Sequence, residues 1–315
     1  MVDAGKQLRL TTLREGGKRA LAYALSQMEA GLETPEIAHL LDEAFAAPLG
    51  VSLGLTGPPG VGKSTLIDAM IKAWRARGKT IAVIAVDPSS ARSGGALLGD
   101  RTRLSTDAAD QGVFVRSMAA RDQLGGVAEI TFPAMVLMRA FYDLVIVETV
   151  GVGQSELVIG EVADMTAFCA QPGSGDALQY MKAGIMEIPD LFVVTKADMG
   201  TLAERTVSDL KGALSLTQDG RGTVPVISCS ATTGTGIDTL MQETCTQIAQ
   251  FLPQAERSRL DQAIRWGNRQ IGTQFGRRGL HLVHTQSVDN IGGSPFGCNL
   301  QRIERLSAAF TAAFE

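Results

Sequence analysis

The sequence has few of the residue types from which metal centres and disulfide frameworks are built. It contains 4 cysteines and 3 histidines among 315 residues, and no two cysteines form a CxxC pair. A structural zinc site or a disulfide scaffold is therefore not expected. Reduced thiols are the ordinary state of such a chain.

The chain also lacks a strong charge imbalance and a long hydrophobic run. It has 29 Lys and Arg residues and 33 Asp and Glu residues, which gives a net charge of -4. The chain therefore has no excess of positive charge for binding nucleic acid. No run approaches the roughly 18 apolar residues that cross a bilayer, and the N-terminus has no apolar signal core. We expect a cytoplasmic protein with neither nucleic acid nor a membrane as partner.

Glycine, in contrast, is abundant. The chain has 35 glycines, about 11% of its residues where about 7% is usual. Hydrophobic residues make up 45% of the chain, enough to bury a sizeable core. The positions of the glycines are therefore the first clue to function.

From Val51 onward, short apolar runs are separated by longer amphipathic stretches. Runs of this length that do not alternate in polarity are typical of strands buried on both faces, with helices between them. They fall at residues 51–57, 80–86, 113–117, 143–149, 163–170, 190–196 and 224–230. We expect an α/β fold with a mostly parallel central sheet covered by helices on both faces.

Helical patterns flank this region. Helices are predicted over 8–30, 35–45, 237–252, 256–275 and 300–314. The expected division is an N-terminal helical extension at 1–49, an α/β domain at 50–252 and a C-terminal helical extension at 253–315.

The first apolar run leads directly into a glycine-rich sequence. Residues 57–65 read GPPGVGKST and match GxxxxGK[ST], the P-loop pattern. Its glycines let the backbone wrap a phosphate chain, while Lys63 supplies positive charge and Ser64 a hydroxyl for Mg²⁺. A plain glycine-rich turn is the alternative. The expected nucleotide contacts are Gly57, Pro58, Pro59, Gly60, Val61, Gly62, Lys63, Ser64 and Thr65.

A second candidate lies in the sequence DLVIVETVGVGQSE at 143–156. Glu148 ends a buried run, so we expect it beside the phosphate loop, at the sheet edge where ligands of such folds bind. There it would hold Mg²⁺ or orient a water, unless it only caps the following helix. Gly151 can bring a backbone N–H to the γ-phosphate.

The third candidate follows the last two apolar runs. Residues 195–198 read TKAD and residues 230–232 read SAT. In P-loop GTPases an (N/T)KxD sequence sets its Asp against two N–H donors of guanine that adenine lacks, and its Lys stem packs along the base. Alone, so short a motif is often a surface turn. The expected base contacts are Thr195, Lys196, Asp198, Ser230, Ala231 and Thr232, with Thr195 in place of the usual Asn.

Two further loops carry charge. The glycine, serine and charged residues that begin at Asp87 predict a loop facing the ligand, although a merely solvated loop is the alternative. Asp87 and Asp100 are candidates for Mg²⁺ or for positioning water. The candidates for neutralising phosphate charge are Arg92, Arg101 and Arg103. Another glycine-rich loop, at 171–176, precedes a helical stretch with Lys182.

Taken together, GPPGVGKST, AVDPSSARSGGALLGDRTR, VETVGVGQSE, QPGSGDALQYMKAGI and TKAD resemble the MeaB/ArgK/MMAA family of G-protein chaperones for adenosylcobalamin-dependent methylmalonyl-CoA mutase. The resemblance implies a homodimeric GTPase that uses GTP, GDP and Mg²⁺, with C-terminal helices forming the dimer. It also implies a role: gating cofactor loading into an acyl-CoA mutase and protecting or reactivating it.

The resemblance carries roles over by position. It places Asp87, Asp100 and Glu148 near Mg²⁺ and the hydrolytic water, and makes Lys182 the basic residue that communicates nucleotide state to the mutase. Asp198 becomes the guanine reader. The replacement of Asn by Thr195 bears on nucleotide affinity more than on base choice, because that Asn mainly ties loops together.

Hydrolysis of GTP needs only positioning and charge neutralisation, and the motifs supply both. Two alternatives remain. A kinase would transfer the γ-phosphoryl group to a small molecule or a transport protein, and a metal-insertion GTPase would need a metal site, for which His281 and His284 are the only closely spaced histidines.

Overall fold

The computed structural model describes residues 8–87, 107, 109–119, 129–149, 155–173, 189–216, 224–285 and 294–312. The chain divides into two compact units. The sheet unit comprises Gly50–Thr131 and Tyr142–Pro253, and the helical unit comprises Met1–Leu49, Phe132–Phe141 and Gln254–Glu315. Each unit is described by itself.

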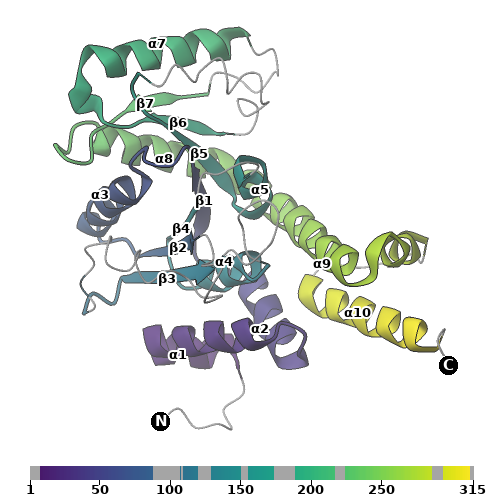
Figure 1. The fold of residues 1–315 in the computed structure, drawn as a ribbon. Coiled ribbons are helices and arrows are strands. Elements are labelled where there is room, and N and C mark those ends of the chain that lie inside the picture. Colours follow the sequence, from purple (N-terminus) through teal and green to yellow (C-terminus); the bar gives the residue numbers. More distant parts are fainter. Residues whose placement is uncertain are drawn as a thin grey trace. The chain divides into compact units, whose positions relative to one another are not determined.

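The sheet unit is built on seven described strands in the order β3-β2-β4-β1-β5-β6-β7 (Figure 1). Every neighbouring pair is parallel, which confirms the predicted parallel sheet. The strands are β1 (Val51–Thr56), β2 (Ile81–Asp87), β3 (Val113–Ala119), β4 (Leu144–Glu148), β5 (Met165–Ala170), β6 (Leu191–Val194) and β7 (Val226–Ser228). Because β1 lies between β4 and β5, the strand order reverses at β1, and ligands of open α/β sheets bind at such points.

Helices cover both faces of this sheet, as predicted. On one face α3 (Lys63–Ala76) and α8 (Ile237–Phe251) contact each other. On the other, α5 (Ser155–Val162) packs so closely on β1 that a Cβ at Gly54 would lie 2.4 Å from Ile159 Cγ1. Gly54 pairs with Thr166 of β5, so Phe168, two residues further on, points to the same face.

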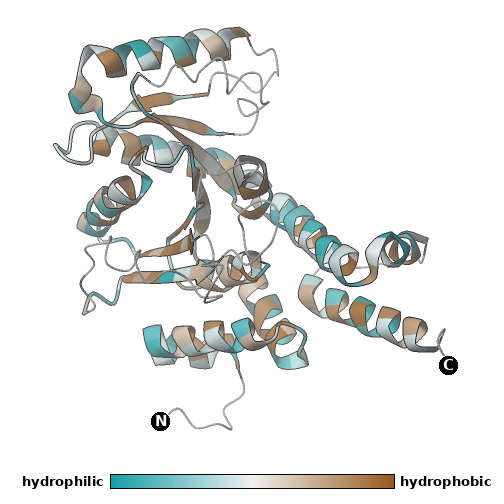
Figure 2. Cartoon of the chain, in the orientation of Figure 1, coloured by the Kyte–Doolittle hydropathy of each residue, from teal (hydrophilic) through white to brown (hydrophobic). Residues whose placement is uncertain are grey.

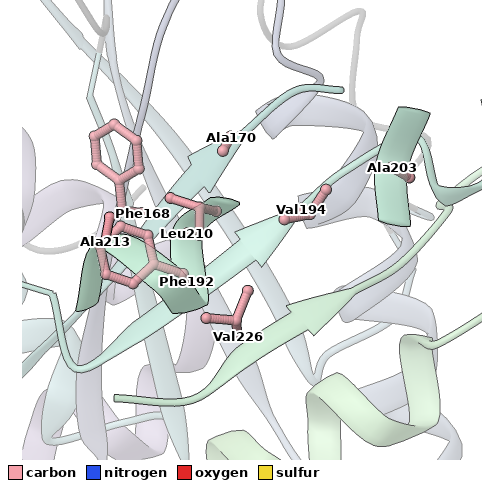
Figure 3. Close-up of a cluster of buried hydrophobic side chains, with 8 residues drawn as sticks. All are labelled: Phe168, Ala170, Phe192, Val194, Ala203, Leu210, Ala213 and Val226. Atoms are coloured by element: carbon pink, nitrogen blue, oxygen red, sulfur yellow. The ribbon is translucent and has the colours of Figure 1, made fainter. Parts of the chain in front are cut away.

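Phe168 belongs to the apolar cluster that fixes α7 (Thr201–Leu216) to this face of β5, β6 and β7 (Figure 3). Phe168 and Phe192 are paired across β5 and β6, with ring centroids 5.8 Å apart, and α7 packs Leu210 against them. Figure 2 shows the strands as predominantly hydrophobic, whereas α7 carries hydrophilic residues along its length. This packing fixes the carboxyl ends of β5 and β6, where the TKAD residues begin.

The helical unit is held by aromatic side chains. Phe296 lies in the centre, with its ring centroid 5.3 Å from Trp266, 6.2 Å from Phe132 and 6.3 Å from Phe45. These rings come from four different helices. The unit contains α1 (Leu10–Ala30), α2 (Pro35–Ala46), α4 (Thr131–Arg139), α9 (Ala255–Thr285) and α10 (Pro295–Ala312).

One predicted helix end in this unit matches a break in the helix, and one predicted start was wrong. A helix was predicted to end at 275, and α9 does break at Gly276, whose φ is 63°. The prediction lacked the helical segment that continues to Thr285, in which Leu280 and Val283 pack with Ile271. The other prediction began at 300, whereas α10 begins at Pro295. Asp42 accepts hydrogen bonds from the first-turn N–H groups of Phe296 and Gly297, each at 3.0 Å, and this long-range cap leaves no local signal.

The dimer-forming role of residues 253–315 stays a prediction. Among the described helices, none is long and apolar enough to cross a membrane.

Asp143 joins the beginnings of β1, β2 and β4. Its carboxylate accepts hydrogen bonds from the Thr80 N–H at 2.8 Å and the Thr80 hydroxyl at 2.7 Å, and Lys79 Nζ donates to it at 3.3 Å. Its own carbonyl accepts from the Val51 N–H. Partial burial raises the pKa of Asp143, but the bonds from Thr80 and Lys79 outweigh it and hold that pKa below the usual value of 3.8.

The lowered pKa predicts a pH-dependent contribution to stability. At pH 7 Asp143→Asn should lower the free energy of unfolding by about 1 kcal/mol, a value that allows for solvent screening at a partly exposed carboxylate. Since the folded-state pKa is depressed, the contribution is full above about pH 4 and fades as the pH falls further. Urea unfolding of both proteins at pH 7 and pH 3 measures it.

Asp238→Asn is the matched control, because that carboxylate is 95% exposed in its ion pair with Arg77. An equal deficit for Asp143→Asn at the two pH values would contradict the assignment.

Candidate functional site

The phosphate loop runs from the end of β1 to the start of α3. Gly57, with φ of 140°, approaches β5 so closely that a Cβ there would lie 2.3 Å from the Cys169 carbonyl oxygen. Gly62 precedes α3 in a left-handed conformation, with φ of 100°, and has no side chain to cap the helix. The N–H groups of the first turn of α3 are therefore available to an anion, as the sequence predicts.

The Lys63 side chain contacts backbone carbonyls at the start of the phosphate loop. Its ammonium donates to the Gly57 carbonyl at 2.7 Å and to the Pro58 carbonyl at 3.2 Å, and the residue is 7% exposed. A buried positive charge therefore lies against the backbone of the predicted phosphate site. An anion in the loop would meet this charge without any large movement of the side chain.

Ser64 and Glu148 are brought together, as predicted. The Ser64 hydroxyl donates to Glu148 Oε1 at 3.1 Å, and Glu148 lies at the end of β4, paired with Leu55 of β1 and Ala85 of β2. Next to it the Thr149 hydroxyl donates to the Thr56 hydroxyl at 3.0 Å, which ties the ends of β4 and β1 together. A hydroxyl and a carboxylate oxygen at this distance suit a hard cation such as Mg²⁺.

Thr195 connects the TKAD residues to the phosphate loop. Its hydroxyl is buried; it donates to the Val61 carbonyl at 2.7 Å and lies 3.2 Å from the Ala170 carbonyl oxygen. The Thr195 N–H also donates to Ala170. The threonine thus performs the loop-tying role that the sequence analysis assigned to the usual asparagine.

Lys196 makes a second connection. Its ammonium donates to the Gly60 carbonyl at 3.0 Å and to Gln171 Oε1 at 3.2 Å. Lys196 has φ of 53°, and among the described residues it is the one non-glycine residue with positive φ. Such backbone is costly and concentrates at functional sites.

Asp198 lies in a short 3₁₀ helix, η2 (Ala197–Met199), with its carboxylate exposed. The SAT residues lie alongside, because the Ala197 N–H donates to the Cys229 carbonyl and the Cys229 N–H to Val194. Ser230 is buried, and its N–H donates to Thr235 within the same turn, while Ala231 and Thr232 are more accessible. The two predicted base-reading segments therefore form one surface.

Several predicted residues cannot be placed in the same way. Asp87 ends β2, two residues after Ala85, the partner of Glu148, but its side chain is not among those described. Asp100, Arg103, Gly151 and Lys182 lie outside the described residues, as do Arg92 and Arg101.

Two thiols lie beneath these loops, as expected of small core residues. Cys169 and Cys229 are both fully buried. Burial raises the pKa of the Cys169 thiol well above its ordinary value and that of Cys229 to about 12. Both are therefore protonated at neutral pH and unsuited to nucleophilic chemistry.

Within the described ranges, no cluster of three or more His, Cys, Asp and Glu side chains is arranged to hold a metal ion. His281 is exposed on α9, and the side chain of His284 is not described.

Sequence reasoning missed the contact of Gln171 with Lys196, the buried Thr56–Thr149 pair and the Gly57–Cys169 approach. Gln171 directly follows β5 and begins the QPGSGDALQYMKAGI motif, but that motif does not indicate a contact with Lys196. Only the parallel pairing of β5 with β1 and β6 brings it to Lys196.

With this geometry established, the chain can be compared with known proteins. The model of the family described as methylmalonyl-CoA mutase-associated GTPase MeaB matches residues 20–278. A putative GTPase of Pyrococcus horikoshii is 41% identical over 237 residues, covering 73% of this chain and 74% of that protein. The mitochondrial methylmalonic aciduria type A homolog of Mus musculus is 40% identical over 226 residues, covering 70% of this chain and 53% of that protein.

Solved structures agree on the fold. The crystal structure of an LAO/AO transport system kinase superposes with a TM-score of 0.66 at 26% identity, covering 98% of this chain and 100% of that one. HypB from Helicobacter pylori, solved in complex with nickel, has a TM-score of 0.51 at 19% identity, covering 68% of this chain and 94% of that one. The second likeness concerns the fold alone.

The hydrogen bond from the Thr195 hydroxyl to Val61 predicts that a substitution at Thr195 changes both the stability of the protein and its affinity for nucleotide. Thr195→Val should keep the shape of the side chain but leave the buried Val61 carbonyl without this donor, at a cost of about 1–3 kcal/mol in stability. Guanine nucleotide affinity should fall about tenfold, because the loop is no longer fixed. Titration with a fluorescent GDP and thermal unfolding measure both effects.

Thr195→Ser retains the hydroxyl and serves as the control. If Thr195→Val matched the parent protein in affinity and stability, the hydroxyl would have no part in ordering the loop.

Proposed function

The chain belongs to the family of methylmalonyl-CoA mutase-associated GTPases, and on this basis we propose that it gates adenosylcobalamin loading into an acyl-CoA mutase and protects or reactivates that enzyme, in a manner controlled by GTP hydrolysis. As a GTPase of this family it binds guanine nucleotides. The observation that carries the nucleotide part of the proposal is the pair of contacts from Thr195 and Lys196 to the phosphate loop, since they unite base-reading and phosphate-binding elements in one site.

The triphosphate would lie along the phosphate loop. The first-turn N–H groups of α3 would donate to its oxygens, and Lys63 would offset the charge of the β- and γ-phosphates. Its existing bonds to Gly57 and Pro58 hold the ammonium close to that position. The loop would therefore bind a phosphate chain with little reorganisation.

Ser64 and Glu148 fit Mg²⁺, and we assign it to them together with Asp87 and Asp100. When bound, Mg²⁺ would neutralise negative charge on the β- and γ-phosphate oxygens. Arg103 is the residue that we propose to neutralise further phosphate charge. Lys182 is the residue that we propose to signal the nucleotide state to the partner. Gly151 would contribute a backbone N–H near the γ-phosphate.

Asp198 would read guanine. Its exposed carboxylate can accept hydrogen bonds from the two N–H donors of that base. The stem of Lys196 would cover the base plane, and a backbone N–H of the SAT residues would donate to the guanine O6. Adenine cannot donate this pair of hydrogen bonds, so with ATP bound the Asp198 carboxylate would have no hydrogen-bond donor from the base.

The link to a mutase rests on relatives. The matched family is described as mutase-associated, and the mouse protein takes its name from methylmalonic aciduria. Methylmalonyl-CoA mutase is the client that we favour, served by a homodimer of this chain.

Transfer of the γ-phosphoryl group to an acceptor is a second candidate, favoured by the kinase name of the protein with the full-length structural match. Release of inorganic phosphate from GTP without any added acceptor separates hydrolysis from that reaction.

Asp198→Asn should change base preference. The amide no longer accepts both guanine donors, so the Kd for GTP should rise at least tenfold. Xanthosine triphosphate, which has a carbonyl where guanine has its amino group, should bind better than it does to the parent protein. Competition against a fluorescent GDP measures both affinities, with excess ATP as a further competitor.

Asp209→Asn, which removes an exposed carboxylate on α7, is the control. Displacement of the labelled nucleotide by ATP as effectively as by GTP would show that Asp198 is not the guanine reader.

The chaperone role predicts a nucleotide-dependent complex. Purified methylmalonyl-CoA mutase should co-elute with the protein in the presence of a non-hydrolysable GTP analogue and should raise its rate of GTP hydrolysis. Transfer of adenosylcobalamin into the apo-mutase should differ between the GTP analogue and GDP. Size-exclusion chromatography, phosphate release and the mutase absorbance spectrum report these results.

An isobutyryl-CoA mutase tested in parallel identifies the client. If no acyl-CoA mutase changed the hydrolysis rate or co-eluted under any nucleotide condition, the chaperone role would be wrong while the GTPase assignment would stand.

A further inference from the structure

Gln171 is the first residue after β5, and it contacts a residue of the proposed base site. Its Oε1 accepts a hydrogen bond from Lys196 Nζ at 3.2 Å, while the same ammonium donates to the Gly60 carbonyl at 3.0 Å. The Lys196 ammonium therefore bridges the phosphate loop and the end of β5. Gln171 begins the QPGSGDALQYMKAGI motif, but the proposed function gives this glutamine no role.

Two acceptors matter because a lysine side chain is otherwise free to rotate. Its four-carbon stem adopts many rotamers, and fixing it costs conformational entropy. One acceptor from the phosphate loop still lets the ammonium move about that contact, whereas a second acceptor just after β5 fixes its position. The left-handed backbone at Lys196, with φ of 53° and ψ of 44°, fixes the other end of the stem.

Gln171 is itself held on both sides. Before it, the Ala170 carbonyl accepts from the Thr195 N–H. After it, Pro172 is buried, and the Gly173 N–H donates to the Thr206 hydroxyl of α7 at 3.3 Å. The glutamine therefore presents its amide from a segment anchored to β6 and α7.

We infer that Gln171 is a positioning residue for the nucleotide base: it holds the Lys196 ammonium so that the lysine stem is already in place to cover the base. This inference rests on the proposed function, which puts the base between Lys196 and Asp198. A base on the stem would in turn shield the two ammonium bonds from water and tighten them. Base occupancy is thereby coupled to the side chain of Gln171.

The test compares ligands with and without a base. Gln171→Leu removes the acceptor and keeps similar bulk, so the Kd for GTP and for inosine triphosphate should rise by the same factor, about three- to tenfold. The Kd for inorganic tripolyphosphate should not change. In steady-state hydrolysis KM should rise while kcat stays within about twofold, because the variant alters binding and not the reacting groups.

Gln171→Glu restores an acceptor and should recover at least the parent affinity for GTP. Gln247→Leu is the matched control, because it removes a glutamine that donates to Glu243 on α8. Thermal unfolding without nucleotide should give the same midpoint for Gln171→Leu as for the parent, which separates positioning from folding.

Lys196→Ala separates this inference from the function on which it rests. If Lys196→Ala bound GTP normally, the base would not lie on Lys196, and both the proposed base site and the role of Gln171 would be wrong. If Lys196→Ala weakened GTP binding and Gln171→Leu did not, only the role of Gln171 would be overturned. Equal weakening of GTP and tripolyphosphate by Gln171→Leu would also overturn it, because the residue would then act on the phosphate loop.

Discussion

The close approach of the phosphate loop to the end of β5 is the contact on which the site depends. A Cβ at position 57 would lie 2.3 Å from the Cys169 carbonyl oxygen, so only glycine lets β1 turn there. Because the loop lies this low over β5, the hydroxyl of Thr195 can reach Val61 and the ammonium of Lys196 can reach Gly60. Base-reading and phosphate-binding elements are therefore joined through backbone carbonyls of the phosphate loop.

Much of the sheet unit was predictable because its signals are local. Each buried strand is a continuous apolar run, and the glycines of the phosphate loop follow the first run directly. The strand order was not predictable, since parallel neighbours are chosen by packing between distant segments. The place of Glu148 beside the phosphate loop could be inferred from its position at the end of a buried run, whereas the contact of Lys196 with Gln171 could not be inferred at all.

The helical unit shows the limit of local patterns more clearly. Apolar spacing found α1 and α2, but the start of α10 depends on Asp42, more than 250 residues away in sequence. Arg14 similarly donates to the carbonyls of Ala140 and Ala47 at the ends of other helical segments. Orphan groups at helix ends can be satisfied by any side chain that the fold brings close, and a single sequence does not disclose which one.

The two buried thiols beneath the nucleotide site should react slowly with thiol reagents, a property that no sequence motif indicates. Oxidants and alkylating reagents attack the thiolate, and at neutral pH burial keeps Cys169 and Cys229 in the thiol form. The carbonyl of Cys169 lies close to Gly57 of the phosphate loop, and the carbonyl of Cys229 accepts a hydrogen bond from the Ala197 N–H of η2. Modification of either sulfur therefore requires the residues that cover it to move first. The rate at which a thiol reagent modifies Cys169 or Cys229, measured apart from the exposed Cys245 and the partly exposed Cys298, therefore reports how often this part of the site opens.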